Sequence, residues 1–227
     1  MASTLSARST AHELLDGEHL DPTDLRVNLR EMAMLNRLPG GVADSVRATH
    51  RLLDGQPRPS VLDLGTGSGD YARRLSRERS VRILAADLRA EVLAVAARTL
   101  RHTSNVTLLT ADARAIPLDD GAVDVVHASL LVHHLDPAEA VAALREMRRV
   151  ARRGLVINDL RRSRLAFALS AATVLALGRG RYTRHDGVLS ARRAYTLQEL
   201  DDLAAEAELR PTWRSARLLP RVTTVYR

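Results

Sequence analysis

Short apolar runs alternate with longer amphipathic segments through the middle of the chain. The apolar runs have the length of strands and lie at residues 61–64, 81–86, 106–109, 123–128 and 155–157. Between them, near residues 70–79, 90–102 and 137–152, apolar residues recur at helical spacing. Strands that are apolar throughout and alternate with helices are typical of a parallel sheet covered on both faces. The pattern therefore predicts an α/β fold.

The two ends of the chain depart from this pattern. Residues 1–57 are predicted to be helical, with a break at the Pro-Gly-Gly of residues 39–41. Near the C-terminus, Thr196 and Glu199 form a capping box ahead of an amphipathic helix, and two strand-like runs follow at roughly 212–226. We therefore expect four parts: an N-terminal helical cap at 1–57, a core at 58–160, a lid insertion at 161–195, and a C-terminal helix and strands at 196–227 that complete the core.

The net charge is concentrated in one segment. The chain of 227 residues carries a formal charge of +7, and all 34 of its basic residues are arginine. Residues 161–193 contain eight arginines and a single acid, Asp186, and this difference equals the whole net charge. An apolar run at residues 165–177 lies inside the same segment. We expect a substrate lid with an apolar floor and a positive rim, or alternatively a packing helix whose arginines face solvent.

Composition excludes several classes of protein. The chain has no cysteine, so disulfides, thiolate metal sites and cysteine nucleophiles are excluded, and a cytoplasmic location is expected. Aromatic residues make up only 3% of the chain, which argues against a nucleic-acid partner held by base stacking. The longest apolar run is shorter than the roughly 20 residues that a transmembrane helix needs. That length still allows peripheral contact with a membrane surface.

Three glycines, Gly65, Gly67 and Gly69, follow the first predicted strand. Glycines let the backbone approach a ligand closely, and the helix that begins after them offers free N–H groups. The dinucleotide-binding spacing would require a glycine at position 70, where this chain has Asp70. A pyrophosphate would also meet the negative charges of Asp63 and Asp70, whereas a cationic ligand would tolerate them. The loop therefore favours a cationic ligand over a nicotinamide or flavin dinucleotide.

Residues 63–69, Asp-Leu-Gly-Thr-Gly-Ser-Gly, resemble the first motif of the class I S-adenosylmethionine-dependent methyltransferases, and the resemblance spans roughly residues 60–160. It implies a Rossmann-like core with a mostly parallel seven-stranded sheet, helices on both faces, and S-adenosylmethionine as the cofactor. In that family a carboxylate at the place of Asp87 grips the ribose hydroxyls, and the pair at Asp112 and Ala113 receives the adenine. The implied cofactor-binding residues are Asp63, Gly65, Thr66, Gly67, Gly69, Asp87, Leu88, Asp112, Ala113 and Ser129.

Further polar groups follow the fourth and fifth predicted strands. His133 and His134 come after the fourth strand and Asp159 after the fifth, and neighbouring strands would bring these ends together. A neutral histidine can take the proton of a hydroxyl group. We expect His134 to be the base and Asp159 to orient it, with His133 beside them as a catalytic or a packing residue. The arrangement resembles small-molecule O-methyltransferases that use a His-His pair and an aspartate.

Further assignments at this site concern a metal ion, the base and the cofactor's carboxylate. Two histidines and an aspartate can also hold a metal ion, but we expect no metal because the further carboxylates or amides of metal-dependent methyltransferases are not apparent. His185, within the basic segment, is a reserve candidate for the base. Arg30, Asn36 and Arg37 are candidates for binding the methionine carboxylate of the cofactor.

The predicted function is base-assisted, metal-independent methyl transfer to a hydroxyl group. The apolar and basic lid suggests a small, largely apolar acceptor, such as a phenolic or polyketide-type compound of secondary metabolism. One alternative is a C-methyltransferase that acts on a quinone or an activated aromatic ring. A second alternative is a protein that binds S-adenosylmethionine without turning it over, because this fold also serves non-methylating proteins. The sequence leaves the oligomeric state open.

Overall fold

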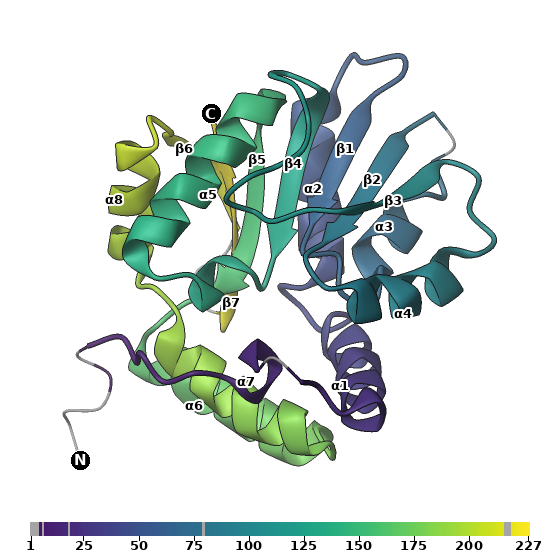
Figure 1. Cartoon of the computed structure of the whole chain (residues 1–227). Coiled ribbons are helices and arrows are strands. Elements are labelled where there is room, and N and C mark those ends of the chain that lie inside the picture. Colours follow the sequence, from purple (N-terminus) through teal and green to yellow (C-terminus); the bar gives the residue numbers. More distant parts are fainter. Residues whose placement is uncertain (1–4, 6, 18, 79, 216–218) are drawn as a thin grey trace.

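Seven strands form one sheet through the centre of the computed structural model, which describes residues 5, 7–17, 19–78, 80–215 and 219–227 (Figure 1). Their order in the sheet is β3-β2-β1-β4-β5-β7-β6. The first five strands are parallel, and β7 runs antiparallel between β5 and β6. The strands are β1 (Ser60–Leu64), β2 (Arg82–Asp87), β3 (Val106–Thr110), β4 (Val123–Ser129), β5 (Ala151–Leu160), β6 (Pro211–Arg214) and β7 (Arg221–Tyr226). The predicted fold with a mostly parallel seven-stranded sheet is confirmed.

Helices cover both faces of this sheet, as predicted. One face carries α2 (Val42–Leu53), α3 (Asp70–Leu75) and α4 (Ala90–Leu100), and the other carries α5 (Pro137–Val150) and α8 (Leu197–Glu206). Each face buries its own set of aliphatic side chains, because the central strands are apolar on both sides. The capping box predicted for Thr196 and Glu199 is present at the start of α8.

The structure differs from the sequence-based expectation at two elements. The predicted strand at 155–157 is the middle of β5, which extends over Ala151–Leu160 because its polar end pairs with β7. We expected residues 1–57 to form a cap, but α2 packs on β4, β5 and β7 and buries Leu52 in the core. The second N-terminal helix is therefore a part of the layer that covers the sheet.

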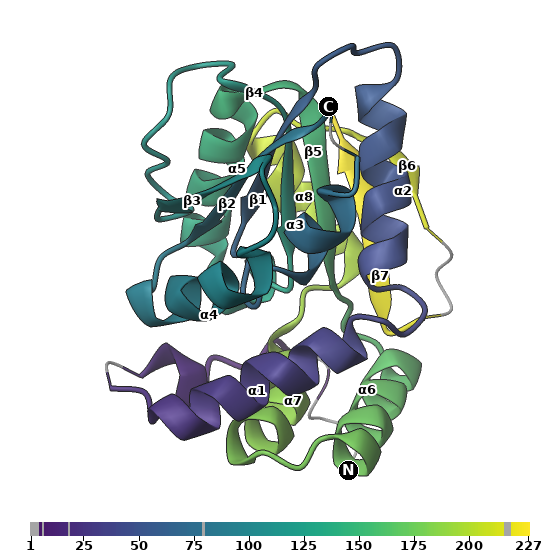
Figure 2. The ribbon, with the colours of Figure 1, turned by 90° about the vertical axis from the view of Figure 1, so that its right-hand side faces the viewer.

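Helices from two further segments form a cap beyond the carboxyl ends of the parallel strands (Figure 2). They are η1 (Leu14–Asp16) and α1 (Pro22–Leu35) from the N-terminal segment, and α6 (Arg164–Leu177) and α7 (Arg181–Arg193) from the segment after β5. The Asn28 amide of α1 donates to Thr183 Oγ1 of α7 (3.1 Å), and both residues are buried. Segments from opposite ends of the chain thus make one cap over the edge where open α/β sheets bind ligands.

The apolar segment at 165–177 becomes α6 and does not reach transmembrane length. None of the helices within the described residues is both long enough and apolar enough to cross a bilayer.

Candidate functional site

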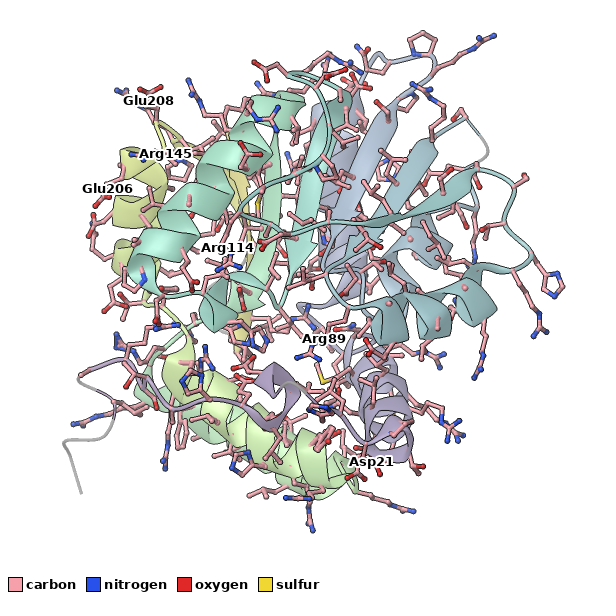
Figure 3. The ribbon with its side chains drawn as sticks, in the orientation of Figure 1. Asp21, Arg89, Arg114, Arg145, Glu206 and Glu208 are labelled. Carbon is pink, nitrogen blue, oxygen red and sulfur yellow. The ribbon has the colours of Figure 1, made fainter. Side chains whose placement is uncertain are left out.

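A cavity of about 960 Å³ lies between the carboxyl edge of the sheet and the cap. Its wall includes the loops after β1, β2, β3 and β4, together with η1, α1, α6 and α7. Arg89, labelled in Figure 3, lines it and donates to the carbonyl of Gly17 (2.5 Å), which links the sheet side to the N-terminal segment. Small-molecule pockets usually enclose about 300–1,000 Å³, so this volume admits a nucleoside cofactor and a second small molecule.

The glycine loop between β1 and α3 presents its backbone to this cavity. Gly65 and Gly67 have positive φ angles of +70° and +56°, which disfavour any other residue. A Cβ at Gly67 would meet only a Leu29 methyl at 3.9 Å, so the backbone there faces open space. A Cβ at Gly69 would approach Leu100 to 3.0 Å, and Gly69 does not line the cavity. The third glycine therefore allows α3 and α4 to pack closely.

Asp63 holds this loop in place from beneath. Its carboxylate accepts a hydrogen bond from Thr66 Oγ1 (2.7 Å) and lies 2.8 Å from His127 Nδ1. His127 is fully buried in β4 and stacks on the Tyr71 ring, with 3.6 Å between the ring centroids. Asp63 also lines the cavity, so it serves the loop and the ligand space at once. The sequence analysis did not identify His127, because one histidine in an apolar strand carries no signal of its partner.

The predicted nucleoside-binding residues lie along the side of the cavity formed by β2 and β3. Asp87 ends β2 and accepts the N–H of Gly67 (3.1 Å), and burial raises the pKa of this carboxyl. Asp112 follows β3 and pairs with Arg114 (2.7 Å), which Figure 3 labels. The other predicted residues on the cavity wall are Gly65, Thr66, Leu88, Ala113 and Ser129.

Four aspartates line the cavity near the glycine loop, and one of them, Asp112, is paired with Arg114. The other three are Asp63, Asp70 and Asp87. A pyrophosphate would be repelled by these carboxylates, whereas a cationic sulfonium group would be stabilised by them. The structure therefore supports the preference that the sequence indicated at Asp63 and Asp70.

At the other end of the cavity, two histidines meet three carboxylates. Both histidines lie on η2 (Val132–His134), directly after β4. His133 is buried, and its Nδ1 lies 2.5 Å from Asp159 Oδ1 on β5. His134 is 27% exposed, and its Nδ1 lies 3.3 Å from Asp16 Oδ1 of η1. Glu13 is buried between the two histidines, with carboxylate oxygens 4.0 Å from His133 Nε2 and 3.7 Å from His134 Nδ1.

The predicted pairing of His134 with Asp159 is therefore wrong. Asp159 accepts from both the ring and the backbone N–H of His133 and does not line the cavity. The two rings lie side by side, with centroids 4.3 Å apart, but the Nδ1 of His133 meets Asp159 of β5 whereas the Nδ1 of His134 meets Asp16 of the N-terminal segment. The carboxylate beside His134 is Asp16, which no spacing rule connects to residues more than 100 positions away.

Helix α7 holds the two N-terminal carboxylates in place. Ser190 Oγ donates to Glu13 Oε1 (2.8 Å), and Arg193 Nη1 donates to Asp16 Oδ2 (2.5 Å). Burial raises the pKa of Glu13. Glu13, His133 and His134 each offer one ligand atom, and these atoms lie within 4.8 Å of one another, so the group could also hold a metal ion. His185, the reserve candidate, is exposed outside the cavity wall.

Comparison with known proteins supports the same family as the glycine loop. Residues 61–154 match a family model described as a methyltransferase domain. The matched residues run from β1 to the start of β5 and include the glycine loop. The chain is 40% identical over 99 residues to an uncharacterized methyltransferase of Mycobacterium tuberculosis. The aligned residues cover 43% of this chain and 39% of that protein. It is 27% identical over 110 residues to a demethylmenaquinone methyltransferase of Chlorobaculum tepidum, covering 48% and 43% of the two chains. The match thus spans less than half of either relative.

The fold of this chain resembles that of solved structures over most of its length. A SAM-dependent methyltransferase from Aquifex aeolicus superimposes with a TM-score of 0.63 at 21% identity, covering 92% of this chain and 98% of that one. The [4+2]-cyclase SpnF superimposes with a TM-score of 0.61 at 18% identity, covering 85% and 71%. At these identities the likeness establishes the fold alone, and the fold is shared by a protein whose name describes a different reaction.

S-adenosylmethionine is the cofactor of methyltransferases of this class, and the cavity suits it. The open backbone at Gly67 and the carboxylate of Asp87 would take the nucleoside. The acidic wall suits a sulfonium cation. Of the ten residues that the sequence predicted for this cofactor, Gly69 alone is absent from the cavity wall.

Arg221 is a candidate for the methionine carboxylate that the sequence analysis missed. It opens β7 and donates to Ser129 Oγ (2.7 Å), Asn158 Oδ1 (2.9 Å) and Asn36 Oδ1 (2.5 Å). A guanidinium has five N–H donors, so two remain for a ligand. Burial lowers the pKa of Arg221 to about 10, at which it is still charged at neutral pH, and no described carboxylate forms an ion pair with it.

The three residues proposed earlier for that carboxylate have different positions. Asn36 lines the cavity, but its amide donates to Asp70 (2.7 Å) and its oxygen accepts from Arg221. Arg30 and Arg37 do not line the cavity. Asn36 therefore orients the charged group that Arg221 supplies.

We expect Arg221→Gln to weaken binding of S-adenosylhomocysteine by about ten- to a hundredfold, because the variant loses a charge-assisted hydrogen bond to the ligand's carboxylate. Binding of 5′-methylthioadenosine, which lacks the amino-acid part, should change less than threefold. Calorimetric titration of both compounds measures the two affinities. Equal losses for both would show that Arg221 acts on the shape of the whole cavity.

A second expectation concerns the buried carboxylate of Asp159, behind the cavity. Burial opposes the charge of Asp159, but His133 and three hydrogen bonds outweigh it and lower the pKa of this carboxyl. A lowered native pKa stabilises the fold above the unfolded value of about 3.9, and this stabilisation is lost as the pH falls through the native value. Asp159→Asn should therefore lower the free energy of unfolding by about 1.5–3 kcal/mol at pH 7.

Urea denaturation of wild type and Asp159→Asn at a series of pH values measures this difference. It should shrink below about pH 4, as the wild-type carboxyl becomes protonated. A difference that stayed constant down to pH 2.5 would mean that the carboxylate charge contributes nothing to stability.

Proposed function

We propose that this protein is an S-adenosylmethionine-dependent methyltransferase that methylates a hydroxyl group of a small, largely apolar acceptor. The observation that carries the proposal is that the glycine loop and His134 line one continuous cavity. The cofactor supplies an electrophilic methyl group, so an acceptor bound near His134 would share the cavity with it. Side chains such as Leu29, Met32 and Leu169 give the cavity an apolar wall that suits an apolar acceptor.

In this proposal His134 takes the proton of the acceptor hydroxyl while the oxygen attacks the methyl carbon, the carbon–sulfur bond breaks and S-adenosylhomocysteine leaves. His134 is the more exposed of the two histidines and lines the cavity, and Asp16 lies against its Nδ1. A carboxylate at one ring nitrogen fixes the tautomer and leaves the other nitrogen free to act as a base. Asp16 thus takes the orienting role that the sequence analysis gave to Asp159. His133, tied to Asp159, supports the position of η2.

Methyl transfer to carbon is a second candidate, favoured by one comparison. The relative from Chlorobaculum tepidum is named for methylation of demethylmenaquinone. An activated ring carbon also loses a proton on methylation, so the same base would serve it. The chemical identity of the methylated atom separates the two candidates.

The test is a screen of phenols, polyketide-type phenols and hydroquinones with methyl-labelled cofactor, followed by mass spectrometry and NMR of the product. Label on oxygen supports the proposal, and label on a ring carbon supports the second candidate. Tight cofactor binding without transfer to any acceptor would favour a non-methylating role, such as the one that the cyclase neighbour's name describes.

We expect His134→Gln to lower kcat by about 10²–10⁴-fold, the usual contribution of a general base. The affinity for S-adenosylhomocysteine should change less than threefold, because His134 lies at the acceptor end. His102→Gln is the matched control, since His102 is exposed and lies outside the cavity. Turnover of His134→Gln close to the wild-type rate would remove this histidine from the mechanism.

Activity in the presence of a strong chelator separates base catalysis from a metal mechanism. The base mechanism predicts unchanged turnover. Loss of turnover that a divalent cation restores would instead assign Glu13, His133 and His134 as metal ligands.

A further inference from the structure

The outer side of α6 is an apolar stripe that no described part of the chain covers. Leu165, Leu169 and Leu175 are 53%, 40% and 51% exposed. Ala168, Ala172 and Ala176 are exposed between them at helical spacing. We call these six residues the α6 stripe. Figure 2 shows α6 at the outside of the cap, and α7 is the helix that packs against it.

Packing inside the protein does not account for this stripe. The inner side of α6 consists of Ala166, Ser170 and Val174, which are buried. A surface helix usually carries polar residues on the side opposite its buried face. Here the sequence between Arg164 and Arg179 contains no charged residue at all. Contiguous exposed apolar residues of this kind mark an interaction surface.

Positive charge surrounds the stripe. Five arginines of this segment are exposed and form no ion pair with any described carboxylate: Arg164, Arg179, Arg181, Arg184 and Arg192. Two of them lie directly against α6. Arg184 donates to the carbonyl of Leu175 (3.2 Å), and the guanidinium of Arg192 lies 5.4 Å from the centre of the Phe167 ring.

We propose that the α6 stripe docks on the surface of an anionic phospholipid bilayer. Leucines on one side of a helix enter the interface between headgroups and acyl chains, and flanking arginines bind lipid phosphates. The 14 residues of α6 span about 21 Å, so the helix lies along the surface and does not cross the hydrocarbon core of about 30 Å.

The charge favours a bilayer over a second copy of this chain as the occupant. Two copies meeting through their stripes would bring two sets of unpaired arginines together, and like charges at such an interface repel each other. An anionic bilayer instead offers phosphates to which these arginines can bind.

The same helix also forms part of the cavity wall. Leu169, Thr173 and Val174 of α6 line the cavity, so a membrane-bound stripe would place the bilayer next to the acceptor space. This step rests on the proposed function, because it supposes an apolar acceptor that partitions into lipid. Docking itself depends only on the stripe and its arginines.

The experiment is co-sedimentation of the full chain with vesicles of phosphatidylcholine containing 40% phosphatidylglycerol, and with vesicles of phosphatidylcholine alone. We expect the protein to bind the anionic vesicles at least five times more strongly than the neutral ones. Binding to the anionic vesicles should weaken as salt rises from about 0.05 to 0.5 M. No binding of the wild type to anionic vesicles would overturn the proposal.

Two double variants test which residues bind. L165E/L175E should reduce partitioning at least tenfold, since both leucines are exposed and neither lines the cavity. R164Q/R181Q should reduce it severalfold and weaken its salt dependence, because Arg179, Arg184 and Arg192 remain charged. Leu108→Glu is the matched control, because Leu108 is 37% exposed on β3, away from the cap. Binding by L165E/L175E equal to that of the control would overturn the assignment to α6.

Light scattering after size exclusion tests the competing occupant. A monomer, or an oligomer that L165E/L175E leaves intact, agrees with docking on lipid. An oligomer that this variant dissociates, together with absent vesicle binding, would assign the stripe to a second copy. Vesicle binding is measured without turnover, so failure of the proposed methyl transfer would not change these outcomes.

Discussion

The cavity depends on the hydrogen bonds that join the N-terminal segment to α7. The carboxylate of Asp186 accepts the N–H groups of Leu14 (2.8 Å) and Leu15 (3.0 Å), and these residues are more than 170 positions apart in the sequence. This interaction fixes η1, and with it the carboxylates of Glu13 and Asp16. Buried carboxylates are costly unless they are hydrogen-bonded. The positions of these two acids beside the histidines are therefore set by α7, and the acceptor end of the cavity exists only when both halves of the cap are folded.

The sheet fixes the opposite end of the cavity by a different principle. From β1 the chain adds β2 and β3 on one side of the sheet, and it then crosses to add β4 and β5 on the other side. The glycine loop lies at this switch point between β1 and β4, where a crevice opens between neighbouring loops. Its positive φ angles and the hydrogen bond that Thr66 donates to Asp63 are local, because these residues are close in sequence. One end of the cavity is thus encoded by a few adjacent residues, and the other end by contacts between distant segments.

This difference explains how much could be predicted from the sequence. The strands, the glycine loop and the residues after β2 and β3 follow from local pattern and from the family resemblance, which assumes the same topology. The partner of His134 could not be predicted, because Asp16 reaches it through a cap whose two halves carry no periodic signal that pairs them. Arg221 was missed for a related reason: its importance arises from the antiparallel insertion of β7 beside β5, which brings it to Asn158 and Ser129. The sequence also could not show which of the two adjacent histidines pairs with Asp159, because that depends on the side-chain directions within a single turn.

Charge is also distributed in a way that a count along the sequence conceals. Of the eight arginines in the basic segment, Arg162 and Arg193 are buried and pair with Glu199 and Asp16, so they belong to the internal structure. The exposed arginines of the cap face solvent and do not line the cavity, whereas four carboxylates line the cavity near the glycine loop. A cationic cofactor is drawn to the interior and an anionic surface to the exterior. Because none of these exposed arginines lines the cavity, a phosphate-rich surface can contact them without competing for the cofactor site.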